Sequence, residues 1–335
     1  MAWLRYQLQH RRTLNEVVPP LTRSGSIDCI YMSWLNYCDR ACGVFGLPPV
    51  DIPISALHMH ISIHEPQHPN AKWMSRISRS VTRRTMARLY TQPRLRTVAI
   101  LVESFAEFAR TTRMPGWQKL TYVPDIGSLE ATLPRIEARA FYSLRPDQTV
   151  MLVFGALTRR KGVDILLKAV DALGDRSNVV VFLAGRQDAE TQAQVADYRR
   201  RVGSWQTRIM VQDAFVNSDD ERRLFSAADI VWVGYPGFLG SSGVLIQAGC
   251  AGLPIISGSH GEIGRVVHRS MCGLTCDLTN VGGVAATIRT LAVDRNLREK
   301  LGVNGRERSR QHSPEIFGAN IYNLIQAAAV PALAG

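Results

Sequence analysis

The feature that most constrains the fold is an alternation of short apolar runs with amphipathic segments between residues 149 and 258. The apolar runs have the length of strands and the segments between them have the length of helices. The expected strands are 149–155, 178–185, 208–215, 229–234 and 254–258. The expected helices are 163–173, 189–202, 220–228 and 243–251. Runs that are apolar throughout are buried on both faces, so the pattern predicts a parallel sheet covered by helices, a doubly wound α/β domain.

The rest of the chain is less regular but also alternates. The strands expected near the N-terminus are 27–32, 53–60, 96–103 and 119–124, and the helices are 3–17, 71–90 and 104–111. Turn residues between 125 and 148 indicate a linker, and two helices are expected in the tail, 281–310 and 314–328. We therefore expect domains at 1–146 and 147–312, with the helical segment 313–335 packing back toward the first domain.

The length and composition agree with this division and exclude several classes of protein. A chain of 335 residues fits two domains at roughly 100–200 residues each. No apolar run approaches the ~18–20 residues that span a bilayer, and the N-terminus has no apolar signal segment. We expect a cytoplasmic protein whose six cysteines are reduced thiols, since their spacing matches no common metal motif.

A first group of polar residues follows the strand expected at 149–155. Gly155 allows a sharp turn, and three consecutive cations, Arg159, Arg160 and Lys161, precede the next helix. Cations beside the amides of a helix N-terminus suit a diphosphate. The alternative is an ordinary polar loop with solvated charges.

A second group follows the strand expected at 229–234. Ser241 or Ser242 can cap the next helix, Gly243 can admit an anion to its amides, and Gln247 lies one turn further on. The alternative is a capped, buried helix followed by a tight loop. Both groups lie at the carboxyl edge of one sheet, where such sheets bind ligands, so we expect them to converge on one ligand.

Three segments, taken in order, carry a family resemblance. They are FGALTRRKGVDILLKAV, AADIVWVGYPGFLGSSGVLIQAGCAGLPIISGSHGEIG and GLTCDLTNVGGVAATIRTLAVDRNLREKLGVNGRERSRQHSPEIF. They resemble the donor-binding domain of GT-B glycosyltransferases of the retaining family 4 type, over about residues 147–327. The resemblance implies two Rossmann-like domains and a nucleoside diphosphate sugar as donor. The family's usual opening strand and glycine-rich loop are not visible before residue 27, so the N-terminal domain is expected to be incomplete.

The resemblance also implies roles for individual residues. Lys161 matches the lysine that holds the donor diphosphate, assisted by Arg159 and Arg160, and Gln247 matches a glutamate that contacts the ribose. A second family glutamate falls on Leu239, so that carboxylate is missing. The amides expected to face the phosphates or the sugar belong to Ser241, Ser242, Gly243 and Val244. The residues expected to border the nucleoside are Arg186, Phe215 and Val216.

The first domain offers a candidate for the reacting centre. In the family a histidine at the end of an N-domain strand lies near the reacting carbon, and the positions that match here are His58 and His60. The alternative for each is a structural histidine with satisfied hydrogen bonds.

A basic helix face is the remaining feature of the first domain. Net charge is +12, and residues 72–96 contain eight cations and no acidic residue. The residues that form this face and its apolar flank are Lys72, Trp73, Arg76, Arg79 and Arg83. The pattern suits an anionic membrane surface or acceptor, and a solvated helix is the alternative. Nucleic acid is an unlikely partner because no recognised motif supports it.

Together these features predict a glycosyltransferase that moves a sugar from a nucleoside diphosphate sugar to a glycan, lipid-linked or polysaccharide acceptor. We expect no cofactor and no metal ion, because lysine, arginine and helix amides can stabilise the leaving diphosphate. The protein could also be peripheral at the inner face of a membrane. Because Leu239 replaces a carboxylate, the alternative is a non-catalytic relative that binds a nucleotide sugar or a partner enzyme. A nicotinamide dehydrogenase is disfavoured because no GxGxxG follows an expected strand.

Overall fold

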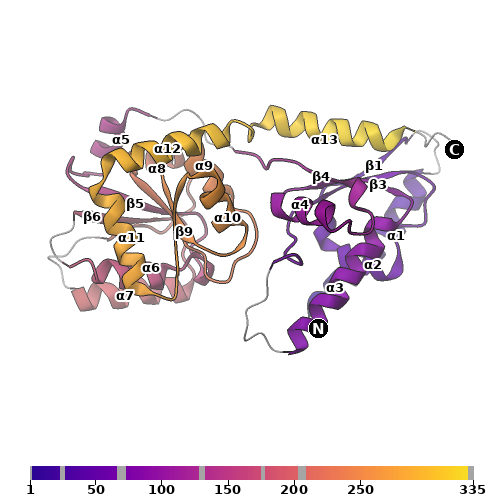
Figure 1. Cartoon of the computed structure of the whole chain (residues 1–335), viewed down its shortest axis with the longest axis horizontal. Coiled ribbons are helices and arrows are strands. Elements are labelled where there is room, and N and C mark those ends of the chain that lie inside the picture. The colour runs from indigo at the N-terminus through magenta and orange to yellow at the C-terminus, as the bar shows by residue number, and fades with distance from the viewer. Residues whose placement is uncertain are drawn as a thin grey trace. The chain divides into compact units, whose positions relative to one another are not determined.

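The computed structural model describes residues 2–22, 27–65, 73–127, 133–174, 178–202 and 209–330. The chain forms two compact units. Unit 1 contains the residues up to Asp125 together with those from Glu315 onward, and unit 2 is Ile126–Pro314. Each unit has its own parallel sheet, as the α/β pattern of the sequence predicts (Figure 1).

Unit 1 is built on a four-stranded parallel sheet in the order β1-β2-β3-β4. The strands are β1 (Ile30–Met32), β2 (Ile54–His58), β3 (Leu95–Ile100) and β4 (Leu120–Tyr122). The helices are α1 (Ala2–Thr22), α2 (Asp39–Phe45), α3 (Trp73–Thr91) and α4 (Glu103–Thr111), with short 3-10 turns η1 (Leu35–Tyr37) and η2 (Trp117–Lys119). A core of side chains from α2, α3, α4 and the strands, including Leu89, Tyr90 and Phe105, is fully buried.

The last helix, α13 (Pro314–Ala329), packs on the opposite face of the unit 1 sheet. Phe317, Ile321 and Leu324 lie against Leu57 and Ala99 of the two central strands. The hydroxyl of Thr97 also donates a hydrogen bond of 3.0 Å to the carbonyl of Leu324. Unit 1 is therefore formed by two segments that are far apart in the sequence.

Unit 2 is built on a six-stranded parallel sheet in the order β10-β9-β8-β5-β6-β7. The strands are β5 (Thr149–Phe154), β6 (Val179–Ala184), β7 (Ile209–Gln212), β8 (Ile230–Val233), β9 (Ile255–Gly258) and β10 (Gly273–Cys276). Every residue of β5, β6 and β8 is buried, which agrees with the unbroken apolar runs of the sequence.

Helices cover both faces of the unit 2 sheet. One face packs against α5 (Arg135–Phe141), α8 (Ser218–Ala227), α9 (Gly243–Ala251) and α10 (Gly261–Ser270). The other packs against α6 (Val163–Asp171), α7 (Ala189–Val202) and α11 (Val281–Val293). Figure 1 shows α6 and α7 on one side of this sheet and α8 and α9 on the other. A further helix, α12 (Arg295–Ser309), packs against α9. None of the described helices of the chain is long and apolar enough to span a membrane.

Some elements differ from the sequence-based expectation. The single helix expected at 281–310 is two helices, because the extended backbone of Asp294 ends α11 and its side chain caps α12 through the amide of Leu297 at 2.8 Å. The segment expected to be a linker contains α5. Arg139 of α5 reaches Asp229 at 3.1 Å, so this segment packs within unit 2. The helices α2 and α10 and the edge strand β10 were not expected.

Candidate functional site

The loop after β5 folds into a compact turn in which Lys161 lies underneath and two arginines lie outside. The residues Arg159–Lys161 form a 3-10 turn, η3, that Gly162 ends at φ +62°. Arg159 and Arg160 are exposed, whereas the Lys161 side chain points inward and is only 3% exposed. Of the three cations that the sequence analysis grouped together, Lys161 is therefore the one that lies beneath the turn.

The buried amine of Lys161 is held by two neutral oxygen atoms. Its Nζ donates to the carbonyl of Phe154 at 2.7 Å and to the hydroxyl of Tyr235 at 2.6 Å. No carboxylate forms an ion pair with it among the residues that the structure describes. Burial, and to a smaller extent the nearby Arg160, lower the pKa of Lys161 to about 7. When it is protonated, the amine therefore has a third N–H and a positive charge for which this part of the chain supplies no counter-ion.

Two glycines lie close to this amine: one leaves space beside it, and the other allows two loops to pack tightly together. Gly155, at φ +96°, directly follows β5, and a Cβ at this position would lie 3.4 Å from Nζ of Lys161. Gly162 packs so closely on the carbonyl of Gly234 that a Cβ there would collide with it. Gly234 follows β8, so this contact joins the turn after β5 to the loop after the neighbouring strand.

Tyr235 connects Lys161 with the start of α9. Its hydroxyl accepts the hydrogen bond from Lys161, and Ser242 lies close enough to act against the pKa shift of the phenol. Burial raises the pKa of Tyr235 to about 12, so the phenol stays neutral. The guanidinium of Arg160 lies over the rings of Tyr235 and Phe238, at 5.6 and 5.0 Å from their centroids. The structure thus brings together the two loops that the sequence suggested would converge.

The start of α9 presents open backbone amides. Ser242 is the N-cap residue, but its side chain makes no capping hydrogen bond, and Gly243 is exposed. Helix geometry leaves the first amides without intrahelical acceptors, so those of Gly243 and Val244 can bind an anion. Ser241 and Val244 are half-buried beside them. A cationic turn and an open helix start, linked through Tyr235, can bind an oxyanion together.

Gln247 is engaged by a residue that the sequence analysis did not single out. Its side-chain amide donates a hydrogen bond to the carboxylate of Glu221 on α8. Burial raises the pKa of Glu221, and the bond from Gln247 opposes this shift. A carboxylate therefore lies next to Gln247, although Leu239 supplies none.

The residues expected to border a nucleoside lie in loops that follow β6 and β7. Arg186 is exposed after β6, and Asp213 after β7 accepts a hydrogen bond from the backbone amide of Gln187 at 2.8 Å. Phe215 is 79% exposed, whereas Val216 packs against the core. These loops share the carboxyl edge with the Lys161 turn, since β5 pairs with β6 and β6 with β7. Contact with a nucleoside stays a prediction.

The two candidate histidines of unit 1 have different surroundings. His58 is 1% exposed, and its ring nitrogens lie 2.8 Å from the Tyr90 hydroxyl and 3.1 Å from the Asp39 carboxylate. This is the satisfied, structural arrangement that the sequence analysis held as the alternative. His60 is exposed at the carboxyl edge of the sheet, so it is the more accessible of the two.

The basic face expected on α3 is described only in part. Lys72 lies outside the described residues, and so do the side chains of Trp73 and Arg76. Arg79 donates hydrogen bonds to the carbonyl of Ile63, and Arg83 lies over the Phe108 ring at 5.2 Å from its centroid. Two of the cations are thus tied to their own unit, and a membrane or acceptor surface here stays a prediction.

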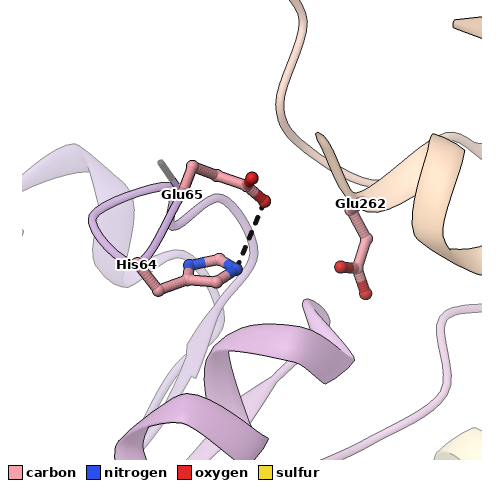
Figure 2. A group of neighbouring side chains, drawn as sticks. All are labelled: His64, Glu65 and Glu262. Atoms are coloured by element: carbon pink, nitrogen blue, oxygen red, sulfur yellow. Dashed lines mark ion pairs between the residues drawn. The ribbon is translucent and has the colours of Figure 1, made fainter. Parts of the chain in front are cut away.

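Figure 2 shows three further side chains. Within unit 1, His64 and Glu65 form an ion pair at 3.3 Å, and His64 also lies 2.6 Å from the hydroxyl of Ser104. Glu262, also drawn, belongs to unit 2, where it lies in the first turn of α10 and pairs with Arg265 at 3.4 Å.

Sequence reasoning missed Tyr235 and Glu221. Tyr235 lies in the GYPG segment directly after an expected strand, which is a place where a ligand-facing residue is common. Glu221 gave no signal, since it is one of three adjacent acidic residues that begin a helix.

Comparisons with known proteins give the family and the fold of the chain. The family model "Glycosyl transferases group 1" matches residues 134–308. An uncharacterized glycosyltransferase of Methanocaldococcus jannaschii is 24% identical over 174 residues, which are 52% of this chain and 43% of that protein. The chain spans about half the length of the curated relatives it matches.

Solved glycosyltransferases share the fold. Sucrose-phosphate synthase from Thermosynechococcus elongatus superposes with a TM-score of 0.70 at 18% identity, covering 95% of this chain and 78% of that one. The Anabaena protein HepE, in complex with UDP-glucose, gives 0.67 at 15% identity, covering 96% and 82%. The fold is therefore GT-B, with two Rossmann-like domains. Because the family model also matches more than half of its length, the chain belongs to the glycosyl transferases of group 1.

Proposed function

We propose that this protein transfers a sugar from a nucleoside diphosphate sugar to a hydroxyl group of a glycan, lipid-linked or polysaccharide acceptor, with retention of configuration. The observation that carries the proposal is the Lys161 amine. It is buried, its partners among the described residues are neutral oxygens, and one of these, the Tyr235 hydroxyl, lies near Ser242 at an open helix start. A diphosphate is the ligand whose charge and size suit both features.

The same groups account for the chemistry. When the bond between the sugar and the diphosphate breaks, negative charge develops on the departing phosphate oxygens. Lys161, the exposed Arg159 and Arg160, and the first amides of α9 are fixed donors that stabilise this charge. The third N–H of Lys161 is the donor that the protein leaves for this purpose.

The similar proteins support the donor class. The Anabaena structure contains UDP-glucose, which is a nucleoside diphosphate sugar. The test below therefore compares nucleotides with different bases.

The test is isothermal titration of the full chain with UDP, GDP and ADP. Lys161→Ala is expected to weaken the binding of the preferred nucleotide by about tenfold or more, because a charge-assisted hydrogen bond is lost. Lys168→Ala is the matched control, since Lys168 lies on the adjoining helix, its side chain is 63% exposed and it pairs only loosely with Asp164 at 3.9 Å. Equal affinity in wild type and Lys161→Ala, or an equal loss in the control, would contradict the proposal.

A specific observation favours a second candidate function. Leu239 cannot hydrogen-bond a sugar, so a non-catalytic relative that only binds a nucleotide sugar or a partner enzyme is the alternative. Donor hydrolysis or sugar transfer by the purified wild-type chain, absent in Lys161→Ala, would exclude it. Nucleotide binding without either reaction would favour it.

A further inference from the structure

Unit 1 carries a group of stacked aromatic rings directly after the first strand of its sheet. We call it the aromatic stack, and its members are Tyr6 and His10 of α1, Trp34, and Tyr37 of η1. Trp34 lies two residues beyond the end of β1, at the carboxyl edge of a parallel sheet. In open α/β sheets this edge is where ligands bind.

The geometry of the 3-10 turn creates the stack. Such a turn has 3.0 residues per turn, so side chains three positions apart are eclipsed. Trp34 and Tyr37 have this spacing, and their rings are parallel within 2°, with centroids 5.0 Å apart. His10 stacks on Tyr37 at 5.0 Å and 20°, and Tyr6 meets the same ring edge-on at 5.8 Å. Tyr37 is therefore held between neighbouring rings.

Hydrogen bonds hold the turn in place. The Asn36 side chain accepts from the amide of Met59 and donates to the carbonyl of His60, both at 2.9 Å. Buried Gln7 donates to the backbone carbonyl of Asn36 at 2.6 Å. The stack is thus tied to α1 and to the end of the neighbouring strand β2, so it is a preorganised surface.

Trp34 ends the stack and presents its ring to solvent. In the described part of the chain its one ring partner is Tyr37, and it is 41% exposed. Tyr37 and Tyr6 are 39% and 42% exposed. A large aromatic residue costs free energy when it is left in water, so a rigidly held exposed ring marks a place where a flat apolar face is to be covered.

We propose that the aromatic stack is an acceptor subsite that binds the pyranose ring of a glycan against Trp34. The inference rests on the proposed function and narrows its acceptor to a sugar. One face of many pyranoses carries several axial C–H groups, which pack on an aromatic ring, while the hydroxyl groups around the rim need polar partners. Exposed Ser33 and His60 lie beside the stack at the same edge and can form hydrogen bonds with these hydroxyl groups.

A rigid turn with polar neighbours suits a sugar better than a bilayer. A lipid surface is met by long side chains that can adjust in depth. Here the rings are fixed by stacking and by the Asn36 hydrogen bonds, which selects for one flat ligand face. Binding to anionic vesicles is therefore the competing outcome of the experiment.

The experiment is saturation-transfer NMR on the full chain with methyl α-glucoside, methyl α-mannoside, methyl α-galactoside and maltotriose. At least one sugar is expected to receive saturation, strongest at the protons of one ring face. Trp34→Ala is expected to reduce the signal about tenfold, and Trp34→Phe to retain most of it. Phe45→Ala is the control, because Phe45 is an exposed aromatic residue of unit 1 outside the stack, at 58% exposure.

The outcomes separate this inference from the proposed function. Titration with UDP, GDP and ADP on the same variants is expected to be unchanged by Trp34→Ala, since Trp34 belongs to unit 1 and Lys161 to unit 2. If a nucleotide binds but no sugar depends on Trp34, the subsite is refuted while the donor site stands. Loss of binding to phosphatidylglycerol vesicles in Trp34→Ala, without any sugar effect, would assign the stack to lipid and overturn the inference. No nucleotide binding in wild type would refute the proposed function itself.

Discussion

At the scale of single residues, the buried amine of Lys161 couples ligand binding to pH. Its pKa of about 7 means that the free protein loses the charge as the pH rises through neutrality, whereas a bound diphosphate would raise this pKa and favour the charge. Binding above pH 7 therefore requires the uptake of a proton. The terminal phosphate of a nucleoside diphosphate has a pKa of about 6, below this range, so it contributes little to the change.

The affinity for the preferred nucleotide is expected to fall between pH 7 and pH 9, by up to about tenfold per unit for a single linked proton. Titration calorimetry in two buffers of different ionisation enthalpy would measure the proton that is taken up. Lys161→Arg is the control, because a guanidinium stays charged throughout this range. A pH dependence that persists in Lys161→Arg would assign the proton to another group.

The same residue is expected to weaken the fold. The pKa of Lys161 is lowered on folding, so the unfolded chain binds more protons between pH 7 and about 10.5, and stability rises with pH across that window. Lys161→Met is expected to raise the free energy of unfolding at pH 7 by about 1–3 kcal/mol, while it weakens nucleotide binding as Lys161→Ala does.

Urea denaturation of wild type and Lys161→Met at pH 7 and pH 9.5 would measure this difference, which is expected to shrink at the higher pH. A less stable Met variant would show that the hydrogen bonds of the amine to Phe154 and Tyr235 outweigh its desolvation cost.

At the scale of elements, a single cap divides the helices α11 and α12. The Asp294 side chain accepts a hydrogen bond from the backbone amide of Leu297. The extended backbone of Asp294 turns the chain between α11 and α12. Asp294→Ala is expected to lower the free energy of unfolding by about 1 kcal/mol, since an N-cap is lost. Urea denaturation would measure it. Glu299→Ala is the control, because Glu299 forms an exposed ion pair with Arg295 on the same helix. A loss there of the same size would show that α12 is sensitive to any surface change.

The elements that sequence reasoning found are those with strong local signals. The runs that became β5, β6 and β8 are apolar throughout because both sheet faces are covered. The edge strand β10 is only partly buried, so its sequence lacks such a run. Likewise α5 has few buried residues, and its place is fixed by Arg139 and Asp229, whose pairing links positions 90 residues apart. No local pattern reveals such a contact.

The site shows the same limit. The glycines and cations around Lys161 are adjacent in sequence, so their joint role could be predicted. The hydrogen bond from Lys161 to Tyr235 joins residues 74 positions apart, and that from Gln247 to Glu221 joins residues 26 positions apart, so neither could be predicted. The surroundings of His58 depend on partners from α2 and α3 in the same way.

At the scale of the whole molecule, the two units have separate cores and separate candidate sites. Scanning calorimetry of the full chain is expected to show two transitions, because compact units with their own cores can unfold one at a time. The preferred nucleotide is expected to raise only the transition of unit 2, by about 2.7 kcal/mol when the nucleotide is present at 100 times its Kd.

Lys161→Ala should remove that shift and leave the other transition in place. A single transition that moves as a whole would show that the units unfold together, and a nucleotide effect on the unit 1 transition alone would place the site elsewhere.

The discontinuity of unit 1 also has a consequence for biosynthesis. Unit 2 is encoded between the two parts of unit 1, so a ribosome completes it while α13 is still unmade. Until then Leu57 and Ala99 have no Phe317, Ile321 or Leu324 to cover them. Unit 1 is thus completed last, although most of it is synthesised before unit 2. One apolar face of its nascent sheet stays uncovered while unit 2 is made.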